Sequence, residues 1–208
     1  VVIGDQSAIT DTRDHGHLVL FGDAATATAL EFDEKATDIY FDGTSDGKGY
    51  RTIYVPDGGK RHPLTVESLD RRLGPDGVVR SGIEIILDGP AILNFSTAIA
   101  PVALKEICEF AGVAMESVDY FVLHQANKII NETIRKKLRM PEDKFPLSLP
   151  DFGNTSSASI PLTITARVRE QFSRPGKTFV LCGFGIGLSC ATMLVRTADC
   201  YCPPMIET

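Results

Sequence analysis

Residues 120–127 read YFVLHQAN, and this short stretch decides how the rest of the chain is interpreted. The apolar run YFVL is typical of a strand that is buried on both faces of a sheet. The polar residues HQAN follow at once, and a helical pattern of apolar residues then continues to about Arg139, before Pro141. A buried strand that leads directly into a helix favours an α/β fold, in which such loops commonly carry functional side chains.

Similar patterns predict further helices and strands on both sides of this unit. A long helix is expected over 95–111, kinked or interrupted at Pro101, and another is expected to follow the loop at 153–159 and to end near Phe172. Residues 43–78 are rich in Gly, Pro, Asp and Lys and are expected to form a long surface excursion. Short strands are expected at 17–22, 24–32, 38–43, 82–87 (or a lead into a helix there), 145–149, 178–183 and 187–196. This alternation predicts an α/β fold with a mixed, five-stranded sheet and helices on both faces.

The composition limits the classes of function. The chain has 27 acidic and 21 basic residues, so its net charge of -6 offers no basic excess to neutralise the phosphates of a nucleic acid. Its five cysteines lack a regular spacing, which argues against a disulfide scaffold or a zinc site and favours reduced thiols in the cytoplasm. No apolar run is long enough to predict a membrane-spanning helix, and no signal peptide is visible. The first residues, VVIGD, look like a strand from a longer protein.

Three loops that follow predicted buried strands carry the residues of chemical interest. His124 fits two interpretations: a strand-end histidine satisfied by the backbone, or a neutral imidazole at a helix N-terminus, where the dipole disfavours the protonated form. Asn154 likewise fits either a turn or cap, or a functional amide. Gly185 and Gly187 form a Gly-x-Gly turn, which is more typical of a β-hairpin than of a phosphate site because no helix clearly follows it. Taken singly, His124 and Asn154 each remain open to both interpretations.

Taken together, the loops resemble one family. HQAN at 124–127, GNTSSASIP at 153–161, FGDAA at 21–25 and FGIGLS at 184–189 resemble, in order and spacing, segments of β-ketoacyl-acyl carrier protein synthase III, a thiolase-like condensing enzyme. The similarity extends over almost the whole chain. It implies a thiolase-like half-domain at 17–196, preceded at 1–16 by the end of an N-terminal half and a linker, and followed at 197–208 by a tail.

The resemblance implies a decarboxylative condensation in fatty acid biosynthesis. In the family, a cysteine takes the acyl group of an acyl-CoA primer, malonyl-acyl carrier protein loses carbon dioxide, and the resulting enolate attacks the acyl-cysteine. The matching positions assign His124 and Asn154 to decarboxylation, as hydrogen-bond donors to the thioester oxygen, and the backbone N–H of Ile186 to an oxyanion hole for the acyl-cysteine. The resemblance implies no cofactor and no metal.

The helix after HQAN resembles the family's docking surface for the acidic acyl carrier protein. Lys136 and Lys137 match a basic pair, whereas the family's arginine two places after the motif is Ile129 here and Lys128 lies one place away. An ordinary solvated helix face is the alternative interpretation of these lysines. The resemblance also implies a homodimer in the full-length enzyme, with neither nucleic acid nor membrane as a partner.

Departures from the family pattern limit what this chain is expected to do. The Ala-Cys-rich turn that carries the family's nucleophile is absent, so the 208 residues are expected to be inactive alone. Ile186 and Cys190 stand where relatives commonly have glycine and tryptophan, and the Ile186 change is expected to alter substrate preference. Two alternatives remain: a non-decarboxylating acyltransferase of secondary metabolism with the same fold, and a non-catalytic subunit that binds a carrier protein.

Overall fold

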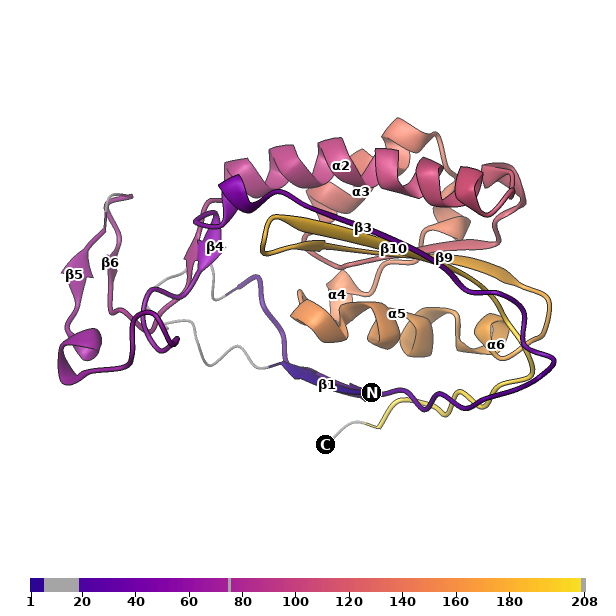
Figure 1. Cartoon of the computed structure of the whole chain (residues 1–208), viewed down its shortest axis with the longest axis horizontal. Helices are drawn as coiled ribbons and strands as arrows, with labels where there is room; N and C mark the ends of the chain where they lie inside the picture. Colours follow the sequence, from indigo (N-terminus) through magenta and orange to yellow (C-terminus); the bar gives the residue numbers. More distant parts are fainter. Residues whose placement is uncertain (6–18, 75, 207–208) are drawn as a thin grey trace.

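The structure, a computed structural model, describes residues 1–5, 19–74 and 76–206. Its main body contains a four-stranded mixed sheet in the order β3-β10-β9-β8 (Figure 1). Strands β8 and β9 run parallel, and β10 is antiparallel to both β9 and β3. The expected strand at 120–123 and the expected C-terminal hairpin are therefore confirmed. The bounds are β3 Tyr40–Ser45, β8 Tyr120–Leu123, β9 Thr178–Gly185 and β10 Ser189–Arg196.

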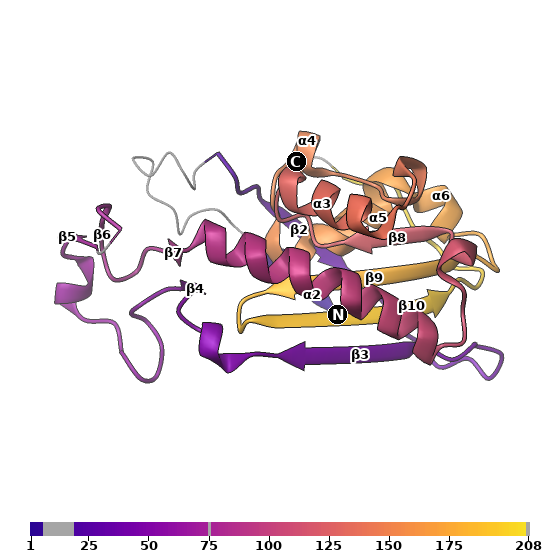
Figure 2. The same cartoon turned by 90° about the horizontal axis from the view of Figure 1, so that it is seen from above.

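Helices cover both faces of this sheet, as expected (Figures 1 and 2). Helices α2 (Gly89–Phe110) and α3 (Lys128–Leu138) lie on one face. Helices α5 (Ser159–Arg167) and α6 (Arg169–Phe172) lie on the other, and the short helix α4 (Leu149–Phe152) precedes them. The arrangement places the loops that follow β8 and β9, and the loop before α5, at the same end of the sheet.

The largest buried cluster lies between α2, α3 and the sheet. Leu104 of α2, Ile134 of α3 and Phe121 of β8 are completely buried in it. The carboxylate of Asp88 caps α2 by accepting a hydrogen bond from the N–H of Ala91 at 3.0 Å. By length and composition alone α2 is apolar enough to cross a membrane, but half of its apolar stretch is buried inside the protein, as is usual for a core helix.

A second, two-stranded sheet lies on the far side of α5. Strand β1 (Val2–Asp5) pairs antiparallel with β2 (Ala24–Ala27), and the pair contacts α5 and the 3-10 turn η6 (Ser156–Ala158). The molecule is therefore layered as helices, main sheet, helices and small sheet (Figure 1). Because η6 directly follows the loop that carries Asn154, the small sheet also supports that loop.

The residues between β3 and α2 form a lobe that projects from the main body, at the left of Figure 1. The expected surface excursion is confirmed, but it has structure of its own. Strand β4 (Ile53–Tyr54) pairs with β7 (Ile86–Leu87), and β5 (Arg72–Leu73) pairs with β6 (Val79–Arg80). The remaining 3-10 turns are η2 (Gly47–Gly49) and η3 (Val66–Leu69) in the lobe, η4 (Met115–Ser117) before β8 and η5 (Glu142–Lys144) after α3.

The prediction of five strands in the main sheet is wrong, because the described residues form four. The expected strand at 145–149 does not form. Pro146 and Pro150 lack the N–H that a ladder needs. Phe145 is instead buried in the core, and the N–H of Ser148 donates to the side-chain oxygen of Gln125 at 3.0 Å.

Several expected elements have different bounds. Residues 17–18 lie outside the described residues, and the rest of the expected strand at 17–22 forms only an isolated bridge between Phe21 and Asn154. β2 is shorter than expected, and only the last two residues of 82–87 pair. Pro101 lies inside α2 without interrupting it. The helix expected to reach Phe172 is divided at Val168 into α5 and α6.

Candidate active site

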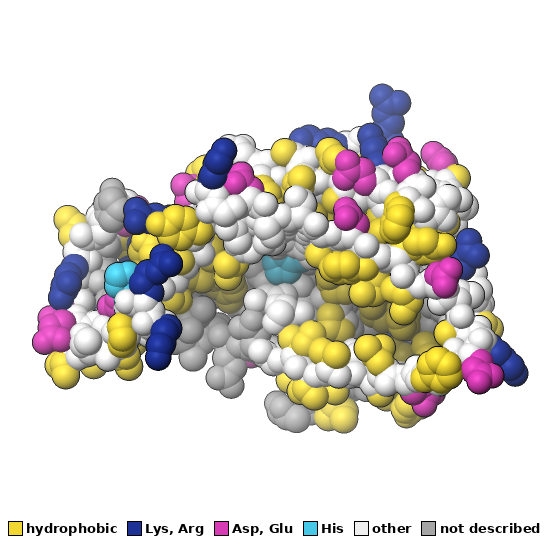
Figure 3. All heavy atoms as spheres, in the orientation of Figure 1, with side chains coloured by type: hydrophobic (Ala, Val, Ile, Leu, Met, Phe, Trp, Pro, Cys, Tyr) yellow, Lys and Arg dark blue, Asp and Glu magenta, His cyan; other side chains and the backbone are white. Residues whose placement is uncertain are grey.

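The three loops singled out by the sequence meet at one cavity of about 570 Å³. His124, Asn154 and Ile186 all line it, and most of the other lining side chains are apolar. Figure 3 shows the corresponding hollow between the lobe and the main body, with a histidine side chain at its floor. Ile53 and Ile85 show that the lobe contributes an apolar wall to this cavity.

His124 follows the last residue of β8, and its backbone is held on both sides. Its N–H donates to the carbonyl of Cys182 in β9 at 2.8 Å, and its carbonyl accepts from the side-chain amide of Asn131 at 3.2 Å. The ring Nδ1 lies 2.8 Å from the hydroxyl oxygen of Ser159. Phe184 contacts the ring edge-on, with centroids 5.5 Å apart. These contacts hold the Nδ1 side of the imidazole, while His124 itself lines the cavity.

The charge state of His124 is set mainly by its surroundings. Burial lowers its pKa from 6.5 to about 4, and a backbone hydrogen bond with Ser156, the smaller of the two effects, raises it. The ring is therefore neutral near pH 7. The neutral imidazole expected from the sequence agrees with this direction, but desolvation rather than the helix dipole is the larger cause.

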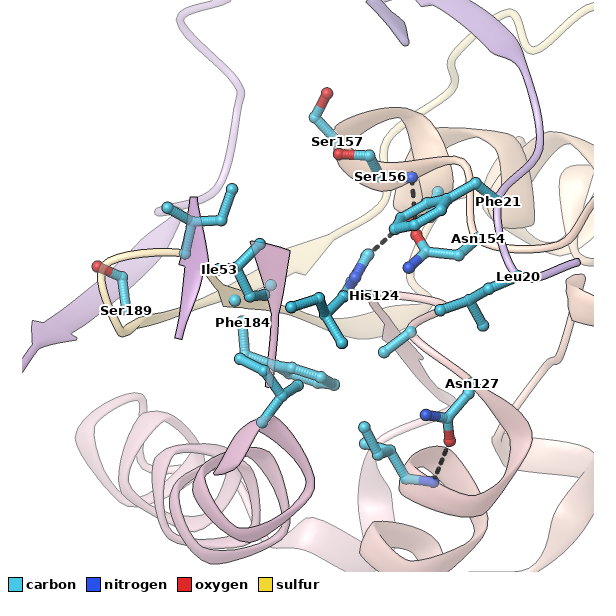
Figure 4. Close-up of a pocket in the computed structure, with 18 of the residues that line it drawn as sticks. Leu20, Phe21, Ile53, His124, Asn127, Asn154, Ser156, Ser157, Phe184 and Ser189 are labelled. Atoms are coloured by element: carbon cyan, nitrogen blue, oxygen red, sulfur yellow. Dashed lines mark hydrogen bonds between the residues drawn. The ribbon is translucent and has the colours of Figure 1, made fainter. Parts of the chain in front are cut away.

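Asn154 is buried, and backbone hydrogen bonds hold it in place. Its N–H donates to the carbonyl of Leu20 and its carbonyl accepts from the N–H of Gly22, both at 2.9 Å. Its side-chain oxygen accepts from the N–H of Ser156 at 2.9 Å. The side-chain NH2 group has no such partner among the described residues, and Figure 4 shows the amide lying beside the ring of His124. The site thus presents two hydrogen-bond donors to the same space.

The turn between β9 and β10 supplies the third group. Gly187 has φ +141°, and a Cβ there would overlap the side chain of Ser189, so this position requires glycine. The side chain of Ile186 is 67% exposed and lines the cavity mouth. Its backbone N–H has no hydrogen-bond partner in the described part of the chain.

The three lysines expected to dock a partner do not share one environment. Lys128 and Lys136 line a second hollow beside α3, together with Glu132. Lys137 instead donates its ammonium hydrogen bond to the carbonyl of Thr97 in α2 at 2.8 Å. Two of the lysines are therefore presented outward, while the third also holds α2 and α3 together.

No cysteine lines the cavity that contains His124. All five cysteines are free, and burial raises the pKa of the Cys108 thiol to about 11. Cys182 and Cys190 lie next to each other in the core with sulfur atoms 3.8 Å apart, and the Cys190 contact and burial raise the pKa of Cys182. Within residues 1–5, 19–74 and 76–206, no three His, Cys, Asp or Glu side chains come together in a way that could hold a metal ion.

The residue-by-residue reading of the sequence missed two contributors to the site. Ser159 contacts the His124 ring, yet the sequence pattern of the segment 153–161 assigns it no role. The backbone at Leu20–Gly22 holds Asn154, and the FGDAA segment that it overlaps does not predict this contact. The sequence motifs include both segments. Only the tertiary contacts show that one segment contacts the ring of His124 and that the other holds the backbone of Asn154.

The chain is similar to known proteins over nearly all of its length. Residues 108–197 match the family described as 3-Oxoacyl-[acyl-carrier-protein (ACP)] synthase III C terminal. The chain is 30% identical to the Beta-ketoacyl-[acyl-carrier-protein] synthase III of Caldanaerobacter subterraneus subsp. tengcongensis, over 94% of this chain and 57% of that protein. It is 32% identical to the protein of the same name from Clostridium acetobutylicum, over 94% of this chain and 58% of that protein.

The fold is similar as well. The crystal structure of a 3-oxoacyl-(acyl-carrier protein) synthase from Burkholderia xenovorans LB400 superimposes with a TM-score of 0.87 at 32% identity, covering 100% of this chain and 58% of that one. The described architecture is therefore that of a thiolase-like half-domain. The chain spans only 57–58% of the length of these two curated relatives.

Proposed function

We propose that the chain is the C-terminal half of a member of the 3-oxoacyl-[acyl-carrier-protein] synthase III family and that it supplies the decarboxylating part of a condensing active site. The substrates are an acyl-CoA primer and malonyl-acyl carrier protein, and the product is a 3-oxoacyl-acyl carrier protein of fatty acid biosynthesis. The observation that carries this proposal is the meeting of His124 and Asn154 in one cavity, each with a hydrogen-bond donor available.

The proposed reaction needs donors at the thioester oxygen of the malonyl group. When the bond to the carboxylate breaks, carbon dioxide leaves and its bonding electrons remain on the thioester as an enolate. The Nε2–H of His124 and the side-chain NH2 of Asn154 then donate to the enolate oxygen. Each such donor typically contributes about 3–4 kcal/mol to the transition state. Because burial keeps His124 neutral, it donates without giving up its proton.

The second step joins the two acyl groups. The enolate carbon attacks the carbonyl of an acyl-cysteine, a carbon–carbon bond forms, and the cysteine sulfur leaves as a thiolate. We assign the N–H of Ile186 to the oxyanion hole for this step, because this N–H has no partner among the described residues and Ile186 lines the cavity. We assign the cysteine itself to a part of the protein outside these 208 residues, since none of the five lines the cavity.

The pairing of His124 with Asn154 favours decarboxylative condensation over a non-decarboxylating acyltransferase of the same fold. An acyl transfer that forms no enolate has no need for two donors aimed at a second oxygen. Lys128 and Lys136, which point outward from α3, are the proposed contacts for the acidic carrier protein. We also propose a cytoplasmic location, supported by the free thiols, and a homodimer of the full-length enzyme.

The test of this proposal is malonyl decarboxylation by the full-length protein. His124→Ala and Asn154→Ala should each lower the rate by about 10²–10³, the usual loss for one oxyanion donor. Asn154→Asp is the sharper variant, because it keeps an oxygen for the N–H of Ser156 but replaces the donor with an acceptor. It should lose as much activity as Asn154→Ala.

Matched controls are available elsewhere on the surface. His62→Ala in the lobe and Asn94→Ala on α2 remove the same residue types from exposed positions. Both should decarboxylate malonyl-acyl carrier protein at the unsubstituted rate. If His124→Ala and Asn154→Ala behaved like these controls, the assignment of the decarboxylating pair would be wrong.

A further inference from the structure

Ser159 contacts His124 from the first turn of α5, and its hydroxyl is almost completely buried at 1% exposure of the residue. Its oxygen has two partners. The ring Nδ1 of His124 lies 2.8 Å away, and the backbone N–H of Gln125 donates to it at 3.3 Å. One buried hydroxyl therefore touches both the functional ring and the backbone of the next residue.

The hydrogens of these groups can be assigned by counting donors and acceptors. The N–H of Gln125 is always a donor, so the Ser159 oxygen must accept from it. The hydroxyl still has one hydrogen to donate, and Nδ1 of His124, 2.8 Å away, can accept it. Donation to Nδ1 requires that this nitrogen be bare. Because the ring is neutral, its proton is then on Nε2 of a residue that lines the cavity.

The opposite arrangement satisfies fewer groups. If Nδ1 carried the proton and donated to Ser159, the hydroxyl hydrogen would be buried without an acceptor. A buried polar group left unpaired destabilises the arrangement that contains it. Nε2 would then be an acceptor and would repel, rather than stabilise, an enolate oxygen.

A buried polar network holds Ser159 in position. The hydroxyl of Thr163 donates to the carbonyl of Ser159 at 2.7 Å and also meets the hydroxyl of Ser148 at 2.8 Å. Ser148 in turn donates its N–H to the side chain of Gln125, whose NH2 group donates to the carbonyl of Leu123 at 2.9 Å. The network links α5 to the end of β8, so the distance between Ser159 and His124 is set by several elements at once.

We propose that Ser159 is a positioning residue that holds His124 in the tautomer with its proton on Nε2, aimed at the substrate oxygen. This inference rests on the proposed decarboxylating role of His124 and adds to it the group that orients the proton. Ser159 itself does not touch the substrate oxygen in this arrangement. Its effect passes through its contact with the imidazole.

The first experiment observes the tautomer directly. Full-length protein labelled with ¹⁵N in its histidine rings is examined near pH 7, and the His124 signals are identified by their loss in His124→Gln. The expected result is a protonated Nε2 and a bare Nδ1. A protonated Nδ1 in the unsubstituted protein overturns the inference, whatever the activity of any variant.

The second experiment removes the hydroxyl. Ser159→Ala should shift the His124 proton away from Nε2 and lower the decarboxylation kcat by roughly 10- to 100-fold, the range seen when a partner that orients a histidine ligand is lost at metal sites. KM for malonyl-acyl carrier protein should change little, because the cavity wall is otherwise intact. Thr165→Val is the matched control: it removes a hydroxyl from the same helix that donates to the carbonyl of Pro161 and does not contact His124.

The outcomes separate this inference from the proposed function. A purely structural role for Ser159 would lower stability without moving the tautomer signals, and that result overturns the inference. Equal kcat values for Ser159→Ala and Thr165→Val would also overturn the inference. Either of these two results can occur while His124→Ala and Asn154→Ala are inactive. The proposed function then stands, and only the role of Ser159 is wrong.

Discussion

The imidazole of His124 is neutral because it lies at the buried floor of a cavity whose walls are largely apolar. Cys182 and Asn131 hold its backbone, and Ser159 and Phe184 contact the ring itself. The same burial also makes the stability of the protein depend on pH. The unfolded chain binds a proton at His124 more readily than the folded chain does.

The stability of the full-length protein should therefore fall as the pH is lowered. The pKa of His124 is about 4 in the folded state against 6.5 ordinarily, so the unfolded state binds the extra proton first. The part of the free energy of unfolding that depends on a neutral His124 is fully present above pH 6.5. It is lost progressively as the pH falls from 6.5 to 4. At pH 5 the loss should be about 1–2 kcal/mol, allowing for partial exposure of the ring. Urea unfolding at pH 7 and pH 5 measures it.

His124→Gln should reduce this pH dependence, because glutamine does not titrate. His62→Gln, an exposed substitution in the lobe, is the control and should keep the dependence of the unsubstituted protein. If the free energy of unfolding changed equally with pH in the two variants, burial of His124 would not govern stability in acid.

At the scale of elements, the segment Leu20–Gly22 acts as a latch on the loop that carries Asn154. The two backbone hydrogen bonds and the bridge from Phe21 form a minimal piece of parallel ladder. Gly22 allows it, because a Cβ at this position would overlap the carbonyl oxygen of Phe152. The glycine is needed for close approach of two backbones rather than for a special φ value.

Gly22→Ala should displace this latch. Overpacking of this kind costs about 1–3 kcal/mol, and Asn154 should lose its position in the cavity, so malonyl decarboxylation should fall along with the melting temperature. Gly47→Ala is the matched control, since a Cβ there meets nothing within 4 Å. A Gly22→Ala protein with the stability and decarboxylation rate of Gly47→Ala would show that the latch is dispensable.

On the scale of the whole molecule, several segments expose large apolar side chains that ordinary soluble domains cover. Val2 in β1 is 82% exposed, Leu30 and Phe32 after β2 are 78% and 88% exposed, and Phe41 in β3 is 60% exposed. The chain spans little more than half the length of its curated relatives. In the full-length enzyme proposed above, we expect the part outside these 208 residues to cover these side chains.

The 208 residues produced alone should therefore self-associate. Light scattering over a range of concentrations should give a mass that rises with concentration, whereas the full-length protein should give a constant mass. A stable monomer of the isolated chain at all concentrations would contradict this expectation.

Docking of an acidic carrier protein should depend on the outward lysines of α3. Lys128→Glu with Lys136→Glu should weaken binding by about tenfold at low salt, because exposed ion pairs contribute about 0.2–1 kcal/mol each and charge reversal adds repulsion. The difference should shrink as salt is added, which titration calorimetry can follow. Lys48→Glu with Lys60→Glu in the lobe is the control, and equal effects of the two pairs would argue against docking on α3.

The sequence by itself determined the parts of this protein that depend on local pattern. The buried runs at 120–123 and 178–183, the helix after HQAN and the family resemblance of the loops all follow from residue order. His124 and Asn154 could be named as a pair because their motifs are local in the chain. The strand expected at 145–149 failed because apolar residues there fill the core from a loop, and a short apolar run does not distinguish the two.

Only the tertiary structure decided how the site is assembled. Ser159 is far from His124 in the chain, and the latch at Leu20–Gly22 is farther still from Asn154, so neither contact leaves a periodic signal. The lowered pKa of His124 likewise comes from burial by several elements together. Local residue order can specify which donors are present. The chain must fold before desolvation and long-range hydrogen bonds decide which nitrogen carries the proton and where it points.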